Sequence, residues 1–183
     1  MKKIAVFLAD GFEEIEGLTV VDLCRRAGIE TDMVSIEDGL MVTGSHKIVV
    51  LADMLFEEVD INGLDMLVLP GGGPGSKRLE AHSGLMEKLD AFYQEGRYIA
   101  AICAAPSILG HRGMLKGRKA CSYPSMEEHL EGALVSRVEV EIDGHIITSR
   151  GMGSSIAFGL AIIRVLCGKE KAEELAATIV YQI

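Results

Sequence analysis

The chain has 183 residues, of which 49% are hydrophobic and 25% are charged, and its formal net charge is −9. This composition is that of an ordinary globular protein and excludes a disordered or low-complexity chain. The acidic balance argues against binding to nucleic acid or to an anionic membrane and favours a small or neutral substrate. At this length, one domain spanning residues 1–183 is expected.

The N-terminal segment and the cysteines both favour a cytoplasmic protein. Only six apolar residues (4–9) precede Asp10, too few for a signal peptide or a membrane span, so this run is interpreted as a buried first strand. The four cysteines form no CxxC pair and show no zinc-ligand spacing, so no metal is predicted. Cys24 and Cys167 fall on apolar faces of predicted helices, where free cysteines are usually core residues of proteins in reducing compartments.

Apolar runs of strand length alternate with segments of helical periodicity. Strands of a parallel sheet that is covered on both faces are apolar almost continuously, whereas a sheet with one wet face alternates. The pattern therefore predicts an α/β fold, a three-layer α/β/α sandwich with a mostly parallel sheet, of the flavodoxin-like or class I glutamine amidotransferase-like type. The four strands are expected at 3–9, 31–36, 65–70 and 97–103.

The predicted helices carry an apolar residue every three or four positions, and three of them end at a glycine. In the segment before Gly168, the expected buried stripe is Ile156, Leu160, Ile163 and Cys167. Two other segments alternate as hairpins do, and Asp143-Gly144 is a strong turn signal. The helices are expected at 13–27, 84–95, 154–167 and 169–179, and the hairpins at 40–51 and 138–150.

Three strand-to-helix turns are the candidates for a functional site, because ligands of open α/β sheets bind beyond the carboxyl ends of the strands. These turns are residues 10–16, 70–75 and 103–106. In the third, a strand that ends at Ile102 runs directly into Cys103, small residues and Pro106. This is the pattern of a nucleophile elbow.

An elbow lifts its reactive side chain off the sheet edge and points it at a helix N-terminus. The free N–H groups there favour a thiolate over a thiol, so Cys103 is a candidate nucleophile. The alternative is a buried structural cysteine in an alanine-rich bend.

The second turn, GGGPG, lacks the lysine of a phosphate loop and the spacing of a dinucleotide fingerprint, so no nucleotide role is indicated. Glycines at a strand end let a backbone N–H approach a reacting oxyanion closely. Gly72 and the N–H of Ala104 are the candidate donor pair, with Gly71 beside them. The alternative is a plain turn without a function.

The first turn holds four carboxylates within seven residues, which is typical of a solvated helix N-terminus. Glu16 differs because it opens the buried part of the predicted helix. Burial would keep this carboxyl protonated, so that it donates a hydrogen bond to a thiolate on a neighbouring turn. Glu16 is therefore the candidate partner of Cys103.

Together, the motifs ADGFEEIE, LPGGGPG, AAICAAPSIL and TSRGMGSS occur in the order and spacing of the DJ-one proteins. The chain resembles this branch of the ThiJ/PfpI superfamily, the Parkinsonism-associated deglycases, from Ile4 to about Gly168. The resemblance implies that Cys103 is the nucleophile and an oxidation-sensitive thiol, that Glu16 is its acid/base partner, and that Gly72 and Ala104 supply backbone donors. It also implies a homodimer with the first helix at the interface.

The chain departs from the family pattern at three positions. Tyr123 stands where many members carry a histidine near the cysteine, and a tyrosine is a poor general base at neutral pH. His46 stands where relatives often have an arginine, and it is either a weaker cation near the site or an exposed hairpin residue. Ala105 replaces a common glycine. The remaining histidines have no ligand spacing and are predicted as surface residues: His82, His111, His129 and His145.

The resemblance implies a cofactor-free enzyme of the glyoxalase III or deglycase type, which converts methylglyoxal to lactate or acts on a glycated substrate. One alternative is a redox sensor or redox-regulated chaperone in which Cys103 is oxidised to a sulfinate. A weaker alternative is a peptidase or amidase of the same superfamily, which requires a histidine partner that the sequence does not place.

Overall fold

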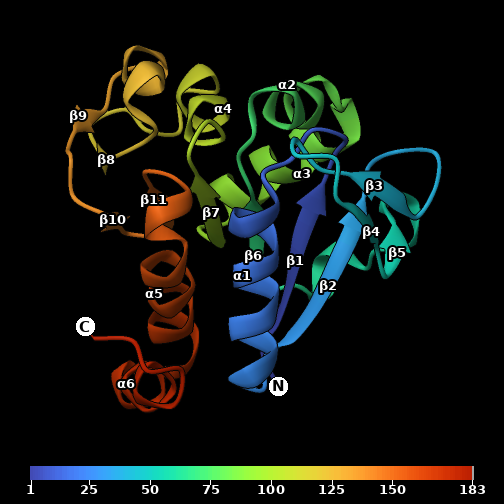
Figure 1. Ribbon diagram of the computed structural model, residues 1–183. Helices are drawn as coiled ribbons and strands as arrows, with labels where there is room; N and C mark the ends of the chain where they lie inside the picture. The colour runs from blue at the N-terminus through green and yellow to red at the C-terminus, as the bar shows by residue number, and fades with distance from the viewer. Residues whose placement is uncertain (183) are drawn as a thin grey trace.

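The middle layer of the molecule is a seven-stranded sheet (Figure 1). In the computed structural model, which describes residues 1–182, its strands lie in the order β10-β11-β7-β6-β1-β2-β5, and all neighbours are parallel except β10 and β11. The prediction of a mostly parallel sheet is thus confirmed. The strands are β1 (Lys3–Leu8), β2 (Glu30–Ser35), β5 (Met54–Leu55), β6 (Met66–Leu69), β7 (Tyr98–Ile102), β10 (Val140–Asp143) and β11 (Ile146–Ser149).

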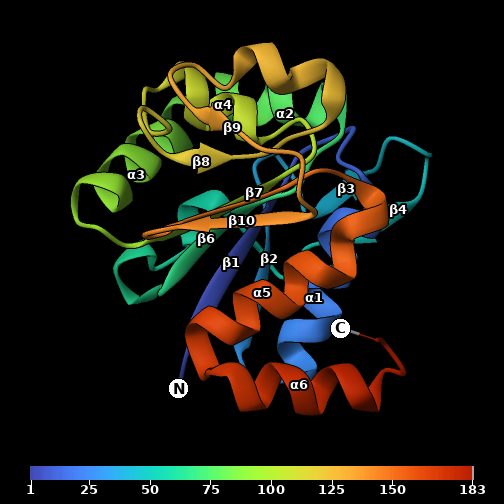
Figure 2. The same cartoon turned by 90° about the vertical axis from the view of Figure 1, so that its left-hand side faces the viewer.

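Helices cover both faces of the sheet, which confirms the three-layer sandwich (Figures 1 and 2). Within residues 1–182, no helix is both long and apolar enough to span a bilayer. One face carries α1 (Glu14–Arg26), α5 (Ser155–Cys167) and α6 (Lys169–Thr178), and the other carries α2 (Gly73–Ala81), α3 (Ser83–Gln94) and α4 (Pro106–His111).

Strand β1 shows why the central strands are apolar throughout. Ile4, Val6 and Leu8 point into the core under α1 and α5, while Ala5 and Phe7 point into the core under α3 and α4. Both sets are fully buried. A strand in this position contributes to two cores, so its side chains from Ile4 to Leu8 are all buried.

Both predicted hairpins are present. β3 (Met41–Thr43) pairs antiparallel with β4 (Val49–Leu51), and β10 pairs with β11 across a two-residue loop that begins at Gly144. The smaller elements were not anticipated: the strands β8 (Lys119–Ala120) and β9 (Leu134–Val135), and the 3₁₀ helices η1 (Phe56–Glu58), η2 (Ile61–Gly63), η3 (Pro124–His129) and η4 (Met152–Ser154).

The predicted buried stripe of α5 is partly wrong. Leu160 and Ile163 are buried, but Ile156 is 38% exposed and Cys167 is exposed. The buried face is rotated because α5 packs on α1 through Gly159, where a Cβ atom would lie 2.6 Å from a methyl carbon of the Leu23 side chain. The expectation that Cys167 is a core residue therefore fails, whereas Cys24 is buried as expected.

Candidate active site

The three candidate turns meet at the carboxyl ends of β1, β6 and β7. Strand β6 lies between the other two in the sheet, so the residues that follow the three strands become neighbours. The Glu13 N–H donates to the Gly71 carbonyl at 2.9 Å, and the Gly71 N–H donates to Glu16 Oε2 at 2.9 Å. The structure thus brings Cys103, Glu16 and the glycine turn together.

Cys103 has the backbone conformation of an elbow. Its φ of 65° lies in the left-handed region, which costs a non-glycine residue roughly 1–3 kcal/mol. Two hydrogen bonds hold it there: its N–H donates to the Ser149 carbonyl, and its carbonyl accepts from the Tyr123 N–H, both at 2.9 Å. The side chain is partly exposed at the end of β7.

Gly71 and Gly72 allow the turns to approach one another. A Cβ atom on Gly71 would lie 2.5 Å from the Cβ of Cys103 and would collide with Glu16 Oε2. Gly72 has a φ of 92°, and a Cβ there would lie 2.7 Å from the Glu13 nitrogen. The site therefore has no room for a side chain at either position.

Two backbone N–H groups lie near the Cys103 thiol. They belong to Gly72 and Ala104, the pair that was expected from the sequence, and they act to lower the pKa of the thiol. Both groups are fixed in the backbone of their turns, so they keep their orientation during a reaction.

Glu16 is a buried carboxyl with a raised pKa. Only 1% of the residue is exposed, and this burial raises its pKa from 4.5 to about 7. The hydrogen bond with Cys103 opposes the rise, the negative charge of Glu13 adds to it, and the Gly71 N–H opposes it. Glu16 Oε1 is buried without a hydrogen-bond partner of normal geometry among residues 1–182.

Cys103 does not have the low pKa that its position at a helix N-terminus predicts. Burial, the charge of Glu16 and the hydrogen bond to Glu16 raise the pKa of the thiol to about 12, and the two backbone donors only partly oppose them. The charge of Glu16 acts only when that carboxyl is ionised. Protonation of Glu16 removes this charge and so favours the thiolate, although burial of the thiol still raises its pKa.

His46 lies at the rim, in the β3–β4 hairpin, and its side chain is exposed. Its Nδ1 is 2.9 Å from Glu14 Oε2 and 3.8 Å from Glu13 Oε1. Burial acts to raise the pKa of Glu14, but hydrogen bonds from the His46 side chain and from backbone N–H groups lower it to about 2. The same bond to Glu14 raises the pKa of His46. His46 is therefore an exposed hairpin residue that neighbours the site through carboxylates.

Tyr123 and Gly151 form another part of the rim. Tyr123 is 51% exposed, and its contact with Cys103 is the backbone hydrogen bond described above. A Cβ on Gly151 would lie 3.5 Å from the Tyr123 ring and 3.9 Å from Glu16 Oε1. Gly151 was not singled out from the sequence, although it lies in the TSRGMGSS motif that contributes to the family resemblance.

The other histidines lie away from Cys103. The Nδ1 of His82 accepts from the Leu85 N–H and caps α3. His145 is not the surface residue that was predicted, because its Nε2 is buried and its ring lies 5.3 Å from that of Tyr93. His111 and His129 contact each other.

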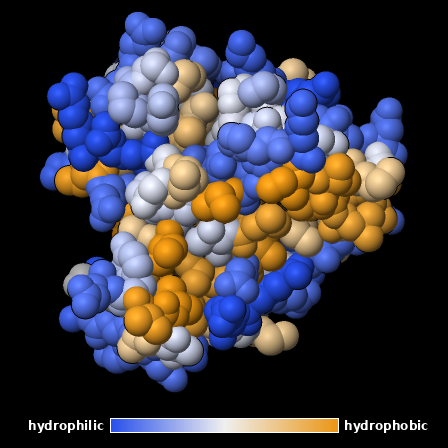
Figure 3. Space-filling model, in the orientation of Figure 1, coloured by the Kyte–Doolittle hydropathy of each residue, from blue (hydrophilic) through white to orange (hydrophobic). Residues whose placement is uncertain are grey.

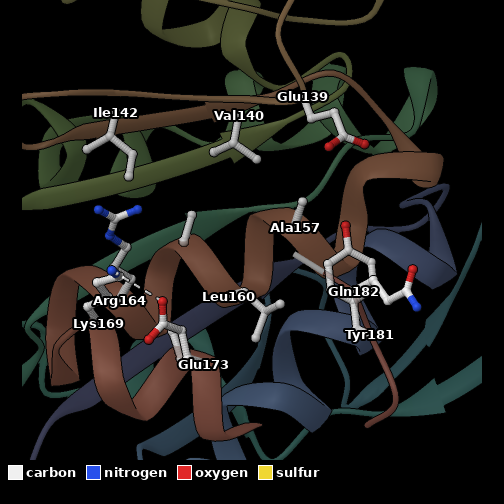
Figure 4. A pocket seen from close by; sticks show the side chains of 12 residues that line it. Glu139, Val140, Ile142, Ala157, Leu160, Arg164, Lys169, Glu173, Tyr181 and Gln182 are labelled. Carbon is white, nitrogen blue, oxygen red and sulfur yellow. Dashed lines mark ion pairs between the residues drawn. The ribbon is translucent and has the colours of Figure 1, made fainter. Parts of the chain in front are cut away.

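A groove of about 430 Å³ lies elsewhere, between β10, α5 and the C-terminal segment (Figure 4). Val140, Ile142 and Leu160 form its apolar walls, and Lys169 and Glu173 form an ion pair at its edge with an N–O distance of 3.4 Å. Neither Cys103 nor Glu16 lines this groove. It is therefore separate from the candidate active site.

Comparison with known proteins agrees with the motifs. The model of the DJ-1/PfpI family matches residues 2–165. The chain is 38% identical to Protein dj-1beta of Drosophila melanogaster, over 96% of this chain and 95% of that protein. It is 32% identical to a protein of Pyrococcus abyssi named a deglycase, over 90% of this chain and 99% of that protein.

Solved structures show the same fold over the full length. Oxidized DJ-1 of Toxoplasma gondii is 36% identical and superposes with a TM-score of 0.96. The superposition covers 100% of this chain and 100% of that chain. The chain is also 37% identical to Protein DJ-1 homolog A of Arabidopsis thaliana, over 96% of this chain but only 46% of that protein. It thus spans less than half the length of this plant relative.

Proposed function

Because the chain belongs to the DJ-1/PfpI family, we propose that it is a cysteine-dependent enzyme that acts on small reactive carbonyl compounds without a cofactor. One observation carries this proposal: two backbone donors and a buried carboxyl with a raised pKa converge on the partly exposed Cys103. The name of the Pyrococcus abyssi relative supports the same class of reaction.

With methylglyoxal as substrate, the Cys103 thiolate adds to the aldehyde carbon and forms a hemithioacetal. The developing alkoxide accepts hydrogen bonds from the N–H groups of Gly72 and Ala104. The alkoxide then takes the proton of Glu16 and becomes a hydroxyl. The Glu16 carboxylate removes the proton from the former aldehyde carbon and returns it to the neighbouring carbon, while the hydroxyl proton moves to the neighbouring oxygen, which gives a thioester of lactate. Water cleaves the thioester, releases lactate and restores the thiol. The sum of these steps is methylglyoxal plus water giving lactate, so no external oxidant or reductant is needed.

Glu16 suits the proton transfers because its pKa of about 7 lets it both accept and donate near neutral pH. Its free Oε1 atom is the position from which the proton moves. Tyr123 presents a phenol at the rim, and a phenol is a weak base at this pH. The general acid/base role therefore falls to Glu16.

The test is steady-state loss of methylglyoxal with detection of lactate. We expect many turnovers in the wild type, none in Cys103→Ser, and a rate at least about 100-fold lower in Glu16→Gln, because a positioned acid/base group contributes factors of this size. Cys167→Ser is the matched control, because it removes an exposed thiol, and it should keep the wild-type rate. A wild type that forms no lactate beyond one equivalent of enzyme would contradict the proposal.

A redox sensor is the second candidate, and one observation favours it: the N–H groups of Gly72 and Ala104 act to lower the pKa of the partly exposed Cys103 thiol. Peroxide would oxidise the Cys103 thiolate in two steps to a sulfinate, with two peroxide molecules reduced to water. The same donors would stabilise the sulfinate oxygens. A protein with this role alone would gain two oxygen atoms on Cys103 at low peroxide but would not turn over methylglyoxal.

A peptidase or amidase role has less support. That chemistry requires a histidine next to the nucleophile. Among residues 1–182, the recorded contacts of all five histidines are with groups other than Cys103. The proposed function therefore does not include hydrolysis of peptide bonds.

We also propose that the protein is a homodimer that pairs through α1 and the β3–β4 hairpin. Large apolar side chains are exposed on both elements, and they gather on the face that Figure 3 shows. Contiguous exposed apolar surface of this kind marks an interaction site. The residues concerned are Ile15, Met41, Ile48, Val49 and Leu51.

Substitution of Val49 tests the dimer. Val49 is 58% exposed in the single chain, and a lysine there would place two positive charges in or near a two-fold interface. Light scattering after size exclusion should give the mass of two chains for the wild type. The same measurement over a range of protein concentrations should show that Val49→Lys dimerises at least about tenfold more weakly. Leu134→Lys, at an exposed apolar position on β9, should remain a dimer. A monomeric wild type at micromolar concentration would rule out this interface.

A further inference from the structure

Three polar side chains meet on the surface beside α4, and the proposed reaction does not use them. His111 Nδ1 lies 2.6 Å from Glu80 Oε1, and His111 Nε2 lies 3.1 Å from His129 Nδ1. Glu80 belongs to α2, His111 ends α4, and His129 ends η3. The partners are 31 and 18 residues apart in the chain, so no ligand spacing was visible in the sequence.

The backbone fixes the relative position of the two histidines. α4 and η3 pack against each other in the upper part of Figures 1 and 2. Gly110 makes this approach possible, because a Cβ there would collide with the His129 carbonyl and lie 2.9 Å from the Glu131 nitrogen. His111 follows Gly110 directly, so the close packing sets the separation of the two rings.

The distance between the ring nitrogens fits a shared metal ion. Two nitrogens that each lie 2.0–2.1 Å from one ion, at an angle between 90° and the tetrahedral value, are roughly 2.8–3.4 Å apart. The observed 3.1 Å lies within this range. An ion would take the place of the proton that the two nitrogens share in the absence of metal.

The remaining ring nitrogens face carboxylates, as they do in most histidine metal sites. Glu80 accepts from His111 Nδ1 and leaves the lone pair of Nε2 directed at His129. Glu128 Oε1 lies 3.8 Å from His129 Nε2 and places a second negative charge near the pair. Both carboxylates also add negative charge close to the ion.

We propose that His111 Nε2 and His129 Nδ1 together bind one divalent transition-metal ion of the kind that imidazole ligands favour, such as Ni²⁺ or Zn²⁺. Water completes the coordination shell, and Glu80 positions His111. The bound ion joins α4, which follows the Cys103 elbow, to η3, which follows Tyr123.

A second group of side chains must be distinguished from this one. Ligand atoms of Glu13, Glu14 and His46 lie within 4.8 Å of one another at the rim of the candidate active site. In that group His46 Nδ1 already contacts Glu14 at 2.9 Å, and no second imidazole is present. The pair formed by His111 and His129 is therefore the stronger site for an ion that prefers nitrogen ligands.

Calorimetric titration of the full-length protein with Ni²⁺ alone tests the proposal, since this ion competes less well for thiols than softer metals do. We expect one ion per chain in the wild type. His129→Gln and His111→Gln should each weaken binding at least about tenfold, and Glu80→Gln should weaken it about tenfold, because it removes only the carboxylate that orients His111. His46→Gln is the matched control and should bind like the wild type.

Localisation by NMR gives a readout that does not depend on any variant. Paramagnetic Ni²⁺, added below one equivalent, should broaden amide signals of α4 and η3 before those of the β3–β4 hairpin. Equal binding by the wild type and His129→Gln would overturn the proposal, as would loss of binding in His46→Gln or first broadening in the hairpin.

Discussion

The free energy of unfolding of Glu16→Gln, measured relative to that of the wild type, should be about 3 kcal/mol higher at pH 8 than at pH 4. Burial raises the pKa of Glu16 from 4.5 to about 7, so between these pH values the folded protein holds a proton that the unfolded chain has lost. The wild type therefore keeps this contribution below pH 4.5 and loses it as the pH rises through 7. Glutamine cannot ionise, and its side-chain oxygen can still accept from the Gly71 N–H.

Denaturant unfolding of both proteins at several pH values between 4 and 8 measures this difference. Glu87→Gln, on the exposed side of α3, is the matched control and should leave the pH dependence unchanged. A constant difference between Glu16→Gln and the wild type over the whole range would show that Glu16 titrates normally in the folded state. With the expected loss of turnover, the variant would show that this carboxyl is kept for function at a cost in stability.

Gly71→Ala should destabilise the protein by about 1–3 kcal/mol and lower turnover of methylglyoxal at least about 100-fold. The new methyl group would lie 2.5 Å from the Cβ of Cys103 and collide with the Glu16 carboxylate. Relief of the collision should move Cys103 and Glu16, the proposed nucleophile and acid/base partner, apart and weaken the hydrogen bond from the Gly71 N–H.

Gly73→Ala is the control in the same turn, because no atom lies within 4 Å of a Cβ at that position. Gly73 begins α2, so alanine should leave turnover unchanged and leave stability unchanged or slightly higher. Unfolding curves and rates for the two variants can be compared directly. Equal effects of the two substitutions would show that close contact around Gly71 is not required.

The central sheet could be predicted because its strands are buried on both faces, which leaves a continuous apolar run in the sequence. The turn at Cys103 could be recognised because a sharp strand-to-helix bend requires small residues, and because Pro106 is typical of the first turn of a helix. The buried face of α5 was misplaced because it depends on the close approach of Leu23 to Gly159, and helical periodicity alone does not specify which neighbour a helix meets.

The surroundings of the site were harder to predict than its central residues. A helix N-terminus next to Cys103 predicted a low thiol pKa, but burial and the neighbouring Glu16 act in the opposite direction. His111 and His129 were read as separate surface residues, although the fold places their rings in contact. In each case the deciding interaction joins segments that are distant in the chain.

The backbone bonds that hold Cys103 in its elbow have a consequence for protein synthesis. The backbone of Cys103 bonds to the backbones of Tyr123 and Ser149, and both residues are synthesised after Cys103. A ribosome-bound chain that has not yet reached Ser149 contains the cysteine but lacks the pairing that keeps its backbone left-handed. Chains growing from the N-terminus fold as their segments emerge. Before Ser149 is synthesised, the nascent chain should carry Cys103 as an ordinary thiol, and the elbow should form only when β11 has joined the sheet.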